Sequence, residues 1–127
     1  MENRDKDTSL PRLLYYILER GAAPTYGNLR LYLIGAGISG RDALRKRYVE
    51  RYAEFHETLA REIAKRAPEA EADYLTWLLL TVMDGVLVQR QLENPVFDAE
   101  NFIRRTAAVA NTLCHEKLPE GSGPAAT

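Results

Sequence analysis

Apolar side chains recur at intervals of three or four residues along most of the chain. This spacing places them on one face of an α-helix, whereas a half-buried strand would alternate apolar and polar residues. The sequence shows neither a sustained alternation nor a hairpin turn signal. The pattern therefore predicts an all-α fold.

The same pattern divides the chain into five helical segments, bounded by capping or breaking residues. Ser9 and Asp98 can cap the first and the last segment, because their side chains can accept hydrogen bonds from the first free backbone N–H groups. Ser39 with Asp42 matches a capping box before the third segment. The helices are expected at residues 9–20, 25–37, 41–67, 69–92 and 98–116.

The third and longest segment combines an aromatic-rich stripe with paired charges. Glu57–Arg61 and Glu62–Arg66 are i,i+4 pairs in the favourable order, each worth roughly a few tenths of a kcal/mol. The second segment, 25–37, has little polar surface, so we expect it to be mostly buried. The stripe expected to be buried on the third segment consists of Leu44, Tyr48, Tyr52, Phe55, Leu59 and Ile63.

The most apolar stretch runs from Tyr74 to Val88, where Asp84 is the only charged side chain. On a helix, Asp73, Asp84 and Gln91 fall nearly on one line, and almost every other direction is apolar. Such a helix must be covered on two sides, and a chain of 127 residues can cover one of them with its own helices. The other side predicts a second copy of the chain. Because Asp84 and Gly85 interrupt the run short of the ~20 residues that a bilayer crossing needs, we expect no membrane span.

Composition and charge narrow the class of protein. Hydrophobic residues make up 46% and charged residues 28% of the chain, which is typical of one globular domain, expected at residues 9–116 between disordered segments 1–8 and 117–127. Seventeen basic residues against 18 acidic residues lack the excess typical of nucleic-acid binding. One cysteine and a charged N-terminus favour the cytoplasm. A basic patch is interpreted as a solvated face, with phosphate binding as the alternative; it consists of Arg41, Arg45, Lys46, Arg47 and Arg51.

Residues Gly35–Gly40 spell a literal G-x-G-x-x-G, the pattern of a dinucleotide-binding turn. The context does not fit, because the following helix opens with the charged segment Arg41–Lys46 and no second strand follows. Glu57 and Glu62 lie within the next helix instead of ending such a strand. The sequence therefore predicts a glycine-rich helix end and a turn, without a nucleotide cofactor.

Other candidate chemistry is sparse. The sequence offers no nucleophile–base pair and no set of metal ligands, so we expect no enzyme activity, no metal and no cofactor. His56 is interpreted as a packed or edge histidine rather than as a base. Asp84 is flanked by apolar residues, so its carboxylate must be paired, hydrated or functional. Its candidate partners are a ligand amine, a tyrosine hydroxyl or water.

Three features follow one another in a distinctive order. They are the charged helix 41–67 with its aromatic stripe, the apolar helix that ends in Met83–Pro95, and the capped helix that opens at Phe97–Ile103. Together they resemble the C-terminal ligand-binding and dimerisation domain of TetR-type transcriptional regulators, over about residues 24–116. The resemblance implies a five-helix orthogonal bundle and a homodimer in which the last two helices of each subunit form an intersubunit four-helix bundle.

The resemblance also implies where a partner subunit and an effector bind. The side of the central helix opposite Asp84 is expected to face the partner, and the side with Trp77, Leu80, Asp84 and Val88 is expected to look inward. A monomeric bundle that mixes these faces is the alternative. The expected dimer interface consists of Leu75, Leu78, Val82, Gly85, Gln89, Phe102, Thr106, Val109, Ala110 and Leu113.

In that family the pocket lies within each subunit, between the central helix and the helices before it. Apolar walls with a few polar groups fit a small lipophilic effector. Aromatic residues at helical spacing also occur in ordinary cores, so a core role is the alternative. The candidate lining residues are Tyr32, Tyr52, Phe55, Trp77, Met83 and Asp84.

The family also carries an N-terminal helix-turn-helix domain. Residues 1–23 hold one helix at most, which is too little for that domain, so we expect no direct nucleic-acid binding by this chain. Removal of such a domain and its natural absence both remain open. The predicted function is that of an effector-binding and homodimerisation domain of a transcriptional regulator. The alternative is a helical protein–protein interaction module without a ligand pocket.

Overall fold

The structure is a computed structural model and describes residues 9–23 and 27–115, in which all regular elements are helices. The all-α prediction is therefore confirmed. The predicted disordered segments, 1–8 and 117–127, lie outside the described residues. The helices are α2 (Leu10–Gly21), α3 (Gly27–Ile38), α4 (Asp42–Arg66), α5 (Ala72–Gln91) and α6 (Ala99–Cys114).

Of the three predicted helix caps, one forms its cap hydrogen bond. Ser9 occupies the N-cap position of α2, but its side chain makes no cap hydrogen bond there. The carboxylate of Asp98 accepts a hydrogen bond of 3.1 Å from the backbone N–H of Asn101, so the predicted cap of α6 is confirmed. The predicted capping box before α4 is wrong, because Arg41 occupies the N-cap position and Asp42 pairs with Arg45 at 2.5 Å. Ser39 belongs to the preceding turn, where its backbone N–H bonds to the carbonyl of Gly35.

Two glycines allow α3 and α4 to meet at a tight angle. Gly40 has a φ of +125°, a backbone conformation that residues other than glycine rarely adopt. A Cβ at Gly37 would lie 3.0 Å from the backbone nitrogen of Arg45, so the absence of a side chain lets the two helices approach closely. The G-x-G-x-x-G segment is thus the predicted helix end and turn.

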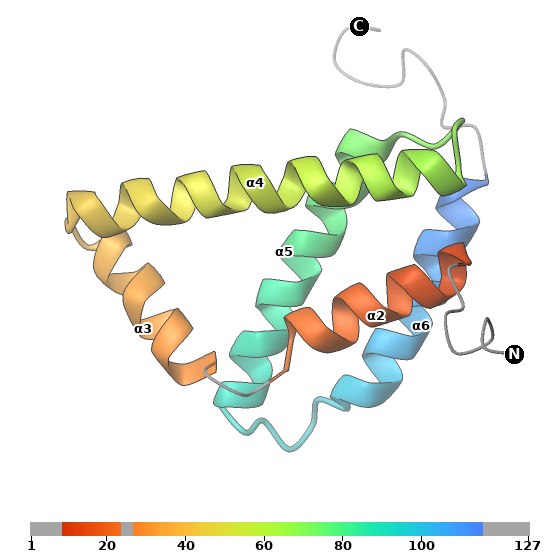
Figure 1. Cartoon of the computed structure of the whole chain (residues 1–127). Helices are drawn as coiled ribbons and strands as arrows, with labels where there is room; N and C mark the ends of the chain where they lie inside the picture. Colours follow the sequence, from red (N-terminus) through yellow and green to blue (C-terminus); the bar gives the residue numbers. More distant parts are fainter. Residues whose placement is uncertain (1–8, 24–26, 116–127) are drawn as a thin grey trace, which may run out of the picture.

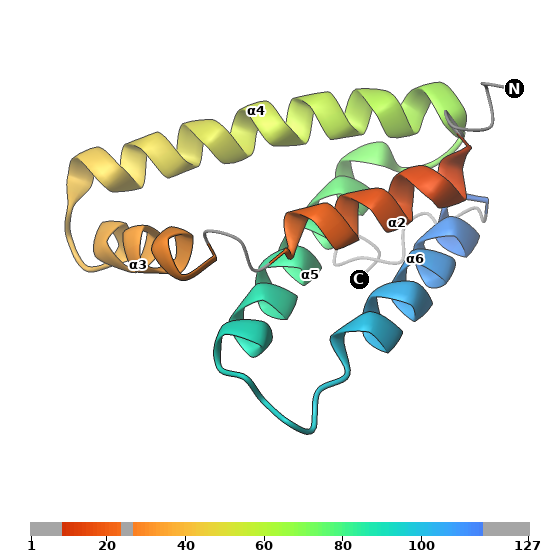
Figure 2. The same cartoon turned by 60° about the horizontal axis from the view of Figure 1, so that its bottom comes forward.

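Helix α5 runs through the middle of the bundle and contacts all the other described helices (Figures 1 and 2). Helix α4 crosses it at a steep angle, while α2 packs against both α5 and α6. Helix α3 packs mainly on the first half of α4 and touches α5. In both views α3 and the beginning of α4 extend away from α2 and α6, and we call this pair of segments (27–38 and 42–52) the arm.

The core lies away from the arm, between α2, the end of α4, α5 and α6. Burying each large apolar side chain contributes about 1.5–3 kcal/mol relative to leaving it in water. Among the described helices, none is long and apolar enough to span a membrane. The large side chains that are less than 2% exposed include Leu14, Leu18, Ile63, Leu75, Leu79, Leu80, Leu87 and Ile103.

The arm is more open than the apolar pattern predicted. Leu29 and Tyr32 of α3 are 56% and 68% exposed, so the expectation of a mostly buried second helix is wrong. The expected single buried stripe of α4 holds at Leu59 and Ile63, but Phe55 is 49% exposed. Among the described helices, α3 packs mainly on α4 and has fewer contacts with α5. Several apolar side chains of the arm therefore remain exposed.

Helix α5 is rotated relative to the expected orientation. Leu80 is buried as predicted, but Trp77 and Val88 are 42% and 38% exposed instead of facing inward. Met83 is buried against α2, where a Cβ at Gly21 would overlap its sulfur. The contacts with α2, α4 and α6 select which apolar side of α5 is covered.

Candidate functional site

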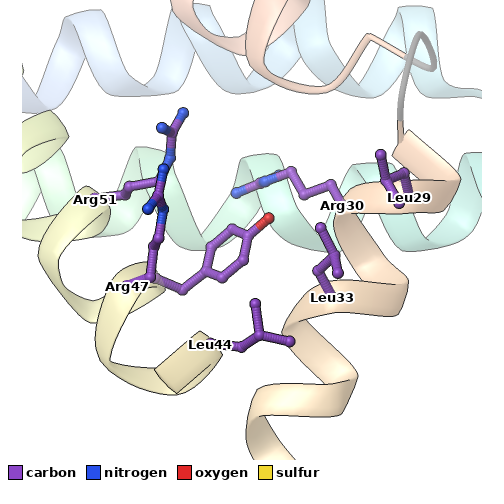
Figure 3. A pocket seen from close by; sticks show the side chains of 7 residues that line it. Leu29, Arg30, Leu33, Leu44, Arg47 and Arg51 are labelled. Carbon is purple, nitrogen blue, oxygen red and sulfur yellow. The ribbon is translucent and has the colours of Figure 1, made fainter. Parts of the chain in front are cut away.

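A cleft of about 370 Å³ separates α3 from α4 in the arm (Figure 3). Side chains three or four residues apart on each helix form its two walls, because this spacing places them on the same helical face. The volume lies within the range of about 300–1,000 Å³ typical of small-molecule sites. The cleft is lined by Leu29, Arg30 and Leu33 of α3 and by Leu44, Arg47, Tyr48 and Arg51 of α4.

The charge of this cleft comes from three guanidinium groups, and no carboxylate lines it. Arg30 reaches from α3 into the space between the helices, whereas Arg47 and Arg51 lie along α4 (Figure 3). Arg47 and Arg51 form no ion pair within residues 9–23 and 27–115. The cleft therefore offers guanidinium donors beside leucine walls.

A second hollow of about 170 Å³ adjoins the cleft toward the turn between the helices. It shares Leu44 and Tyr48 with the cleft, and its walls are almost entirely apolar. Its remaining lining residues are Ile34, Gly37, Ile38, Arg45, Val49 and Tyr52.

Arg30, Tyr52 and Asp84 connect the arm to the central helix, and we call these three residues the polar triad. The Nη2 atom of Arg30 donates to the hydroxyl of Tyr52 at 2.8 Å and lies 2.8 Å from Oδ1 of Asp84. The Tyr52 hydroxyl donates to Oδ2 of Asp84 at 2.5 Å. Oδ1 of Asp84 accepts no hydrogen bond from Arg30 within the described residues, so the contact between these two side chains is an ion pair.

The hydroxyl of Tyr52 is held in its protonated form. Burial, followed by the hydrogen bond and the charge of Asp84, raises the pKa of Tyr52 to about 12. Asp84 thus has a tyrosine hydroxyl as partner, which was one of the three predicted alternatives. Its second partner, Arg30, was not foreseen.

The six residues predicted to bind an effector do not line one cavity. Tyr52 and Asp84 come together in the polar triad, and Tyr52 also lines the smaller hollow. Tyr32 and Phe55 are 68% and 49% exposed, and Met83 is buried in the core. Their roles in binding stay predictions. Tyr52 and Asp84 both contact Arg30, which lines the cleft.

Trp77, the sixth predicted residue, lies on the α4–α5 surface. Its ring stacks on His56 with centroids 4.6 Å apart, and Nε2 of His56 lies 2.9 Å from Oδ1 of Asp73. The interpretation of His56 as an edge histidine agrees with this packing. The described residues contain no group of His, Cys, Asp or Glu side chains arranged to hold a metal ion.

The residues predicted for a dimer interface divide into three sets by their burial. Leu75 and Ala110 are 0% and 1% exposed and belong to the chain's own core. Gly85, Phe102 and Val109 are exposed on α5 and α6, where a partner subunit has access to them. The remaining predicted residues are partly buried: Leu78, Val82, Gln89, Thr106 and Leu113.

The sequence prediction missed most of the cleft. Arg30 is the one charged residue in the apolar segment 29–34, which is a signal for a functional cation. Arg47 and Arg51 belong to the predicted basic patch, and both follow Leu44 at helical spacing on α4. The facing wall comes from another helix, so the periodicity of one helix does not reveal the cleft.

Comparison with known proteins gives one family match. A family model described as BetI-type transcriptional repressor, C-terminal, matches residues 36–115. This range extends from the end of α3 to the residue after α6. A search of curated proteins and a search of solved structures each found no match.

Proposed function

Because the chain belongs to the BetI-type transcriptional repressor C-terminal family, within the TetR-type regulators, we propose that it pairs two subunits through α5 and α6 and binds an effector in the arm. The role of the family in effector binding and dimerisation is the premise. The particular surfaces are inferred from the exposed residues of this chain.

The observation that carries the proposed dimer is an apolar surface on α5 and α6. Phe102 and Val109 are 40% and 58% exposed, and Thr106 and Leu113 continue the same stripe of α6. On α5, a Cβ at Gly85 would have no neighbour within 4 Å in the described chain. A glycine at this open position lets a partner helix approach the backbone closely.

The proposed dimer is tested by sedimentation velocity at micromolar concentrations. Val109→Glu places a charge in the α6 stripe and should shift the chain to monomers, because an unpaired buried carboxylate is costly. Val49→Glu is the matched control, since Val49 is 62% exposed but lies on α4. A monomeric wild-type chain, or equal association of both variants, would contradict the proposed interface.

The proposed effector site is the cleft between α3 and α4. Its leucines supply apolar walls, and its guanidiniums supply the few oriented polar groups that fix a ligand in such sites. The cleft is tested by thermal unfolding in the presence of small amphipathic compounds, because binding to the folded state raises the midpoint. Leu33→Trp fills the cleft and should abolish the shift, while Leu92→Trp, at a 68% exposed position after α5, should retain it.

A second candidate function rests on exposed apolar side chains of α3. Leu29, Tyr32 and Ile38 are 56%, 68% and 78% exposed, which favours docking of this helix on another protein. In that case no small compound should raise the unfolding midpoint, and Tyr32→Lys should weaken the association with the partner protein.

A further inference from the structure

We propose that the cleft between α3 and α4 takes an amphipathic anion, and that the anionic group of this ligand competes with Asp84 for Arg30. The inference rests on the proposed effector site and names the class of ligand for it. It also gives a route by which an occupied cleft changes the contacts of α5.

The arginines determine the charge of the ligand. A guanidinium group presents a planar fork of donors that matches a carboxylate or a phosphate. Arg47 and Arg51 lie on one wall without an ion pair in the described chain, and Arg30 faces them from α3 (Figure 3). Three cations without a carboxylate among the lining residues repel one another, and an anion relieves this repulsion.

The leucines determine that the anion carries an apolar body. Leu29, Leu33 and Leu44 line the same space as the guanidiniums (Figure 3). An inorganic anion would leave this apolar wall in water, whereas an alkyl or aryl group would cover it and gain about 25 cal/mol per Å². A neutral lipophilic molecule would cover the leucines but leave Arg47 and Arg51 without an ion pair in the described chain.

Arg30 belongs to the cleft and to the polar triad at the same time. Its Nη2 atom is 2.8 Å from Asp84, and its side chain is 26% exposed, so it is accessible from the cleft. A ligand anion that accepts from Arg30 weakens the ion pair with Asp84. Asp84 then keeps the hydrogen bond from Tyr52. Since Asp84 precedes the exposed Gly85 on α5, occupancy of the cleft changes a contact next to the proposed dimer surface.

Competition makes the coupling reciprocal, because two groups that share one partner weaken each other's binding. Removing the charge of Asp84 frees Arg30 for the ligand. Asp84→Asn should therefore bind the anion more tightly than the wild-type chain, a result that a purely structural role of Asp84 would not produce.

The experiment is isothermal titration calorimetry of the full chain with four probes: decanoate, decyl phosphate, 1-decanol and acetate. Decanoate and decyl phosphate are used below their critical micelle concentrations, and 1-decanol is used below its solubility limit. Decanoate or decyl phosphate should bind one per chain, and the stronger of the two distinguishes a carboxylate from a phosphate ligand. Decanol and acetate should each bind roughly tenfold or more weakly, because each lacks one of the two contacts.

Matched variants locate the site. Arg47→Gln should weaken binding of the preferred anion roughly tenfold, as expected for loss of a charge-assisted hydrogen bond. Lys46→Gln removes the same charge from the neighbouring position of α4, outside the cleft, and should change the affinity less than about twofold. Neither Arg47 nor Lys46 has an ion pair in the described chain, so we expect both variants to fold like the wild-type chain.

The outcomes separate the inference from the proposed function. Equal affinity for decanol and decanoate, unchanged by Arg47→Gln, would overturn the anion while leaving a lipophilic effector site in place. An unchanged or weaker affinity of folded Asp84→Asn would overturn the competition for Arg30. If none of the four probes binds, both the anionic ligand and the effector site in the cleft are ruled out. The proposed dimer is tested separately by sedimentation velocity.

Discussion

At the scale of single residues, the polar triad shows how one partly buried carboxylate is accommodated. Asp84 lies in an apolar helix, and its side chain remains 32% exposed. A guanidinium and a phenol hydroxyl approach its two oxygens, so the carboxylate keeps partners for its charge despite the partial burial. The polar triad therefore joins the arm to α5 through the side-chain atoms of three residues.

Replacing Asp84 by asparagine should lower the free energy of unfolding by about 1–2 kcal/mol, because Arg30 loses its charged partner and Tyr52 a strong acceptor. Urea denaturation measures the change. Asp42→Asn is the control, since the pair of Asp42 with Arg45 is exposed and should cost less than about 0.5 kcal/mol. Equal losses in the two variants would contradict a special role for the triad.

The raised pKa of Tyr52 predicts a loss of stability at high pH. Below pH 10 both the folded and the unfolded chain keep the phenol proton, so the stabilisation is fully present. As the pH rises from 10 toward 12, the unfolded chain releases this proton before the folded chain does, and the free energy of unfolding falls. Tyr52→Phe should show a flatter decrease over this window in chemical denaturation. Parallel curves for the two proteins would refute the pKa argument.

At the scale of helices, close packing in the arm depends on one missing side chain. Gly37 costs helix propensity relative to alanine, but it lies against the backbone of α4 at Arg45. Gly35, two residues earlier on the same helix, has no atom within 4 Å of an added Cβ in the described chain. The two glycines therefore offer a matched comparison of packing and propensity.

Gly37→Ala should destabilise the chain by about 1 kcal/mol, because the new methyl group forces α3 away from α4 and outweighs the gain in propensity. Gly35→Ala should stabilise it by up to about 1 kcal/mol through propensity alone. Thermal and urea unfolding measure both changes. If both alanines stabilise the chain, α4 moves to accommodate the methyl group without destabilising the fold, and the prediction for Gly37→Ala is wrong.

At the scale of the whole molecule, two of the exposed apolar surfaces have different proposed partners. The α5–α6 surface includes Phe102 and Val109, and the arm exposes Leu29 and Tyr32. The polar triad lies between these regions and joins α3, α4 and α5. A ligand in the arm and a second subunit on α5 and α6 are therefore proposed for separate surfaces of one chain.

A homodimer makes the unfolding midpoint depend on protein concentration. Each tenfold increase in concentration should stabilise the dimer by about 1.4 kcal/mol relative to unfolded chains, by mass action. Calorimetric scans at several concentrations measure the shift. Val109→Glu should make the midpoint independent of concentration, and a wild-type midpoint that is also independent would argue for a monomer.

The fold was largely accessible from the sequence, and the site was not. Asp98 marked the start of α6 correctly, and the glycines at 35–40 marked a helix end and turn. The exposure of Tyr32 and Trp77 was predicted wrongly, because both α3 and α5 are apolar on several sides. The periodicity of a helix indicates which of its faces is apolar, but it does not indicate which neighbouring helix covers that face.

The sequence by itself determined the helices and their order, since helix periodicity and capping act between residues only a few positions apart. The family followed from the resemblance of these helices to TetR-type regulators, and the family match confirms it. Only the tertiary structure decided the cleft and the polar triad. Tyr52 is 22 residues from Arg30 and 32 residues from Asp84, so their contacts exist only after α3, α4 and α5 have packed. Helix packing selects one apolar side of α5 to bury. That selection positions Asp84 beside Arg30, which neutralises its charge, and beside Tyr52, which donates a hydrogen bond to it.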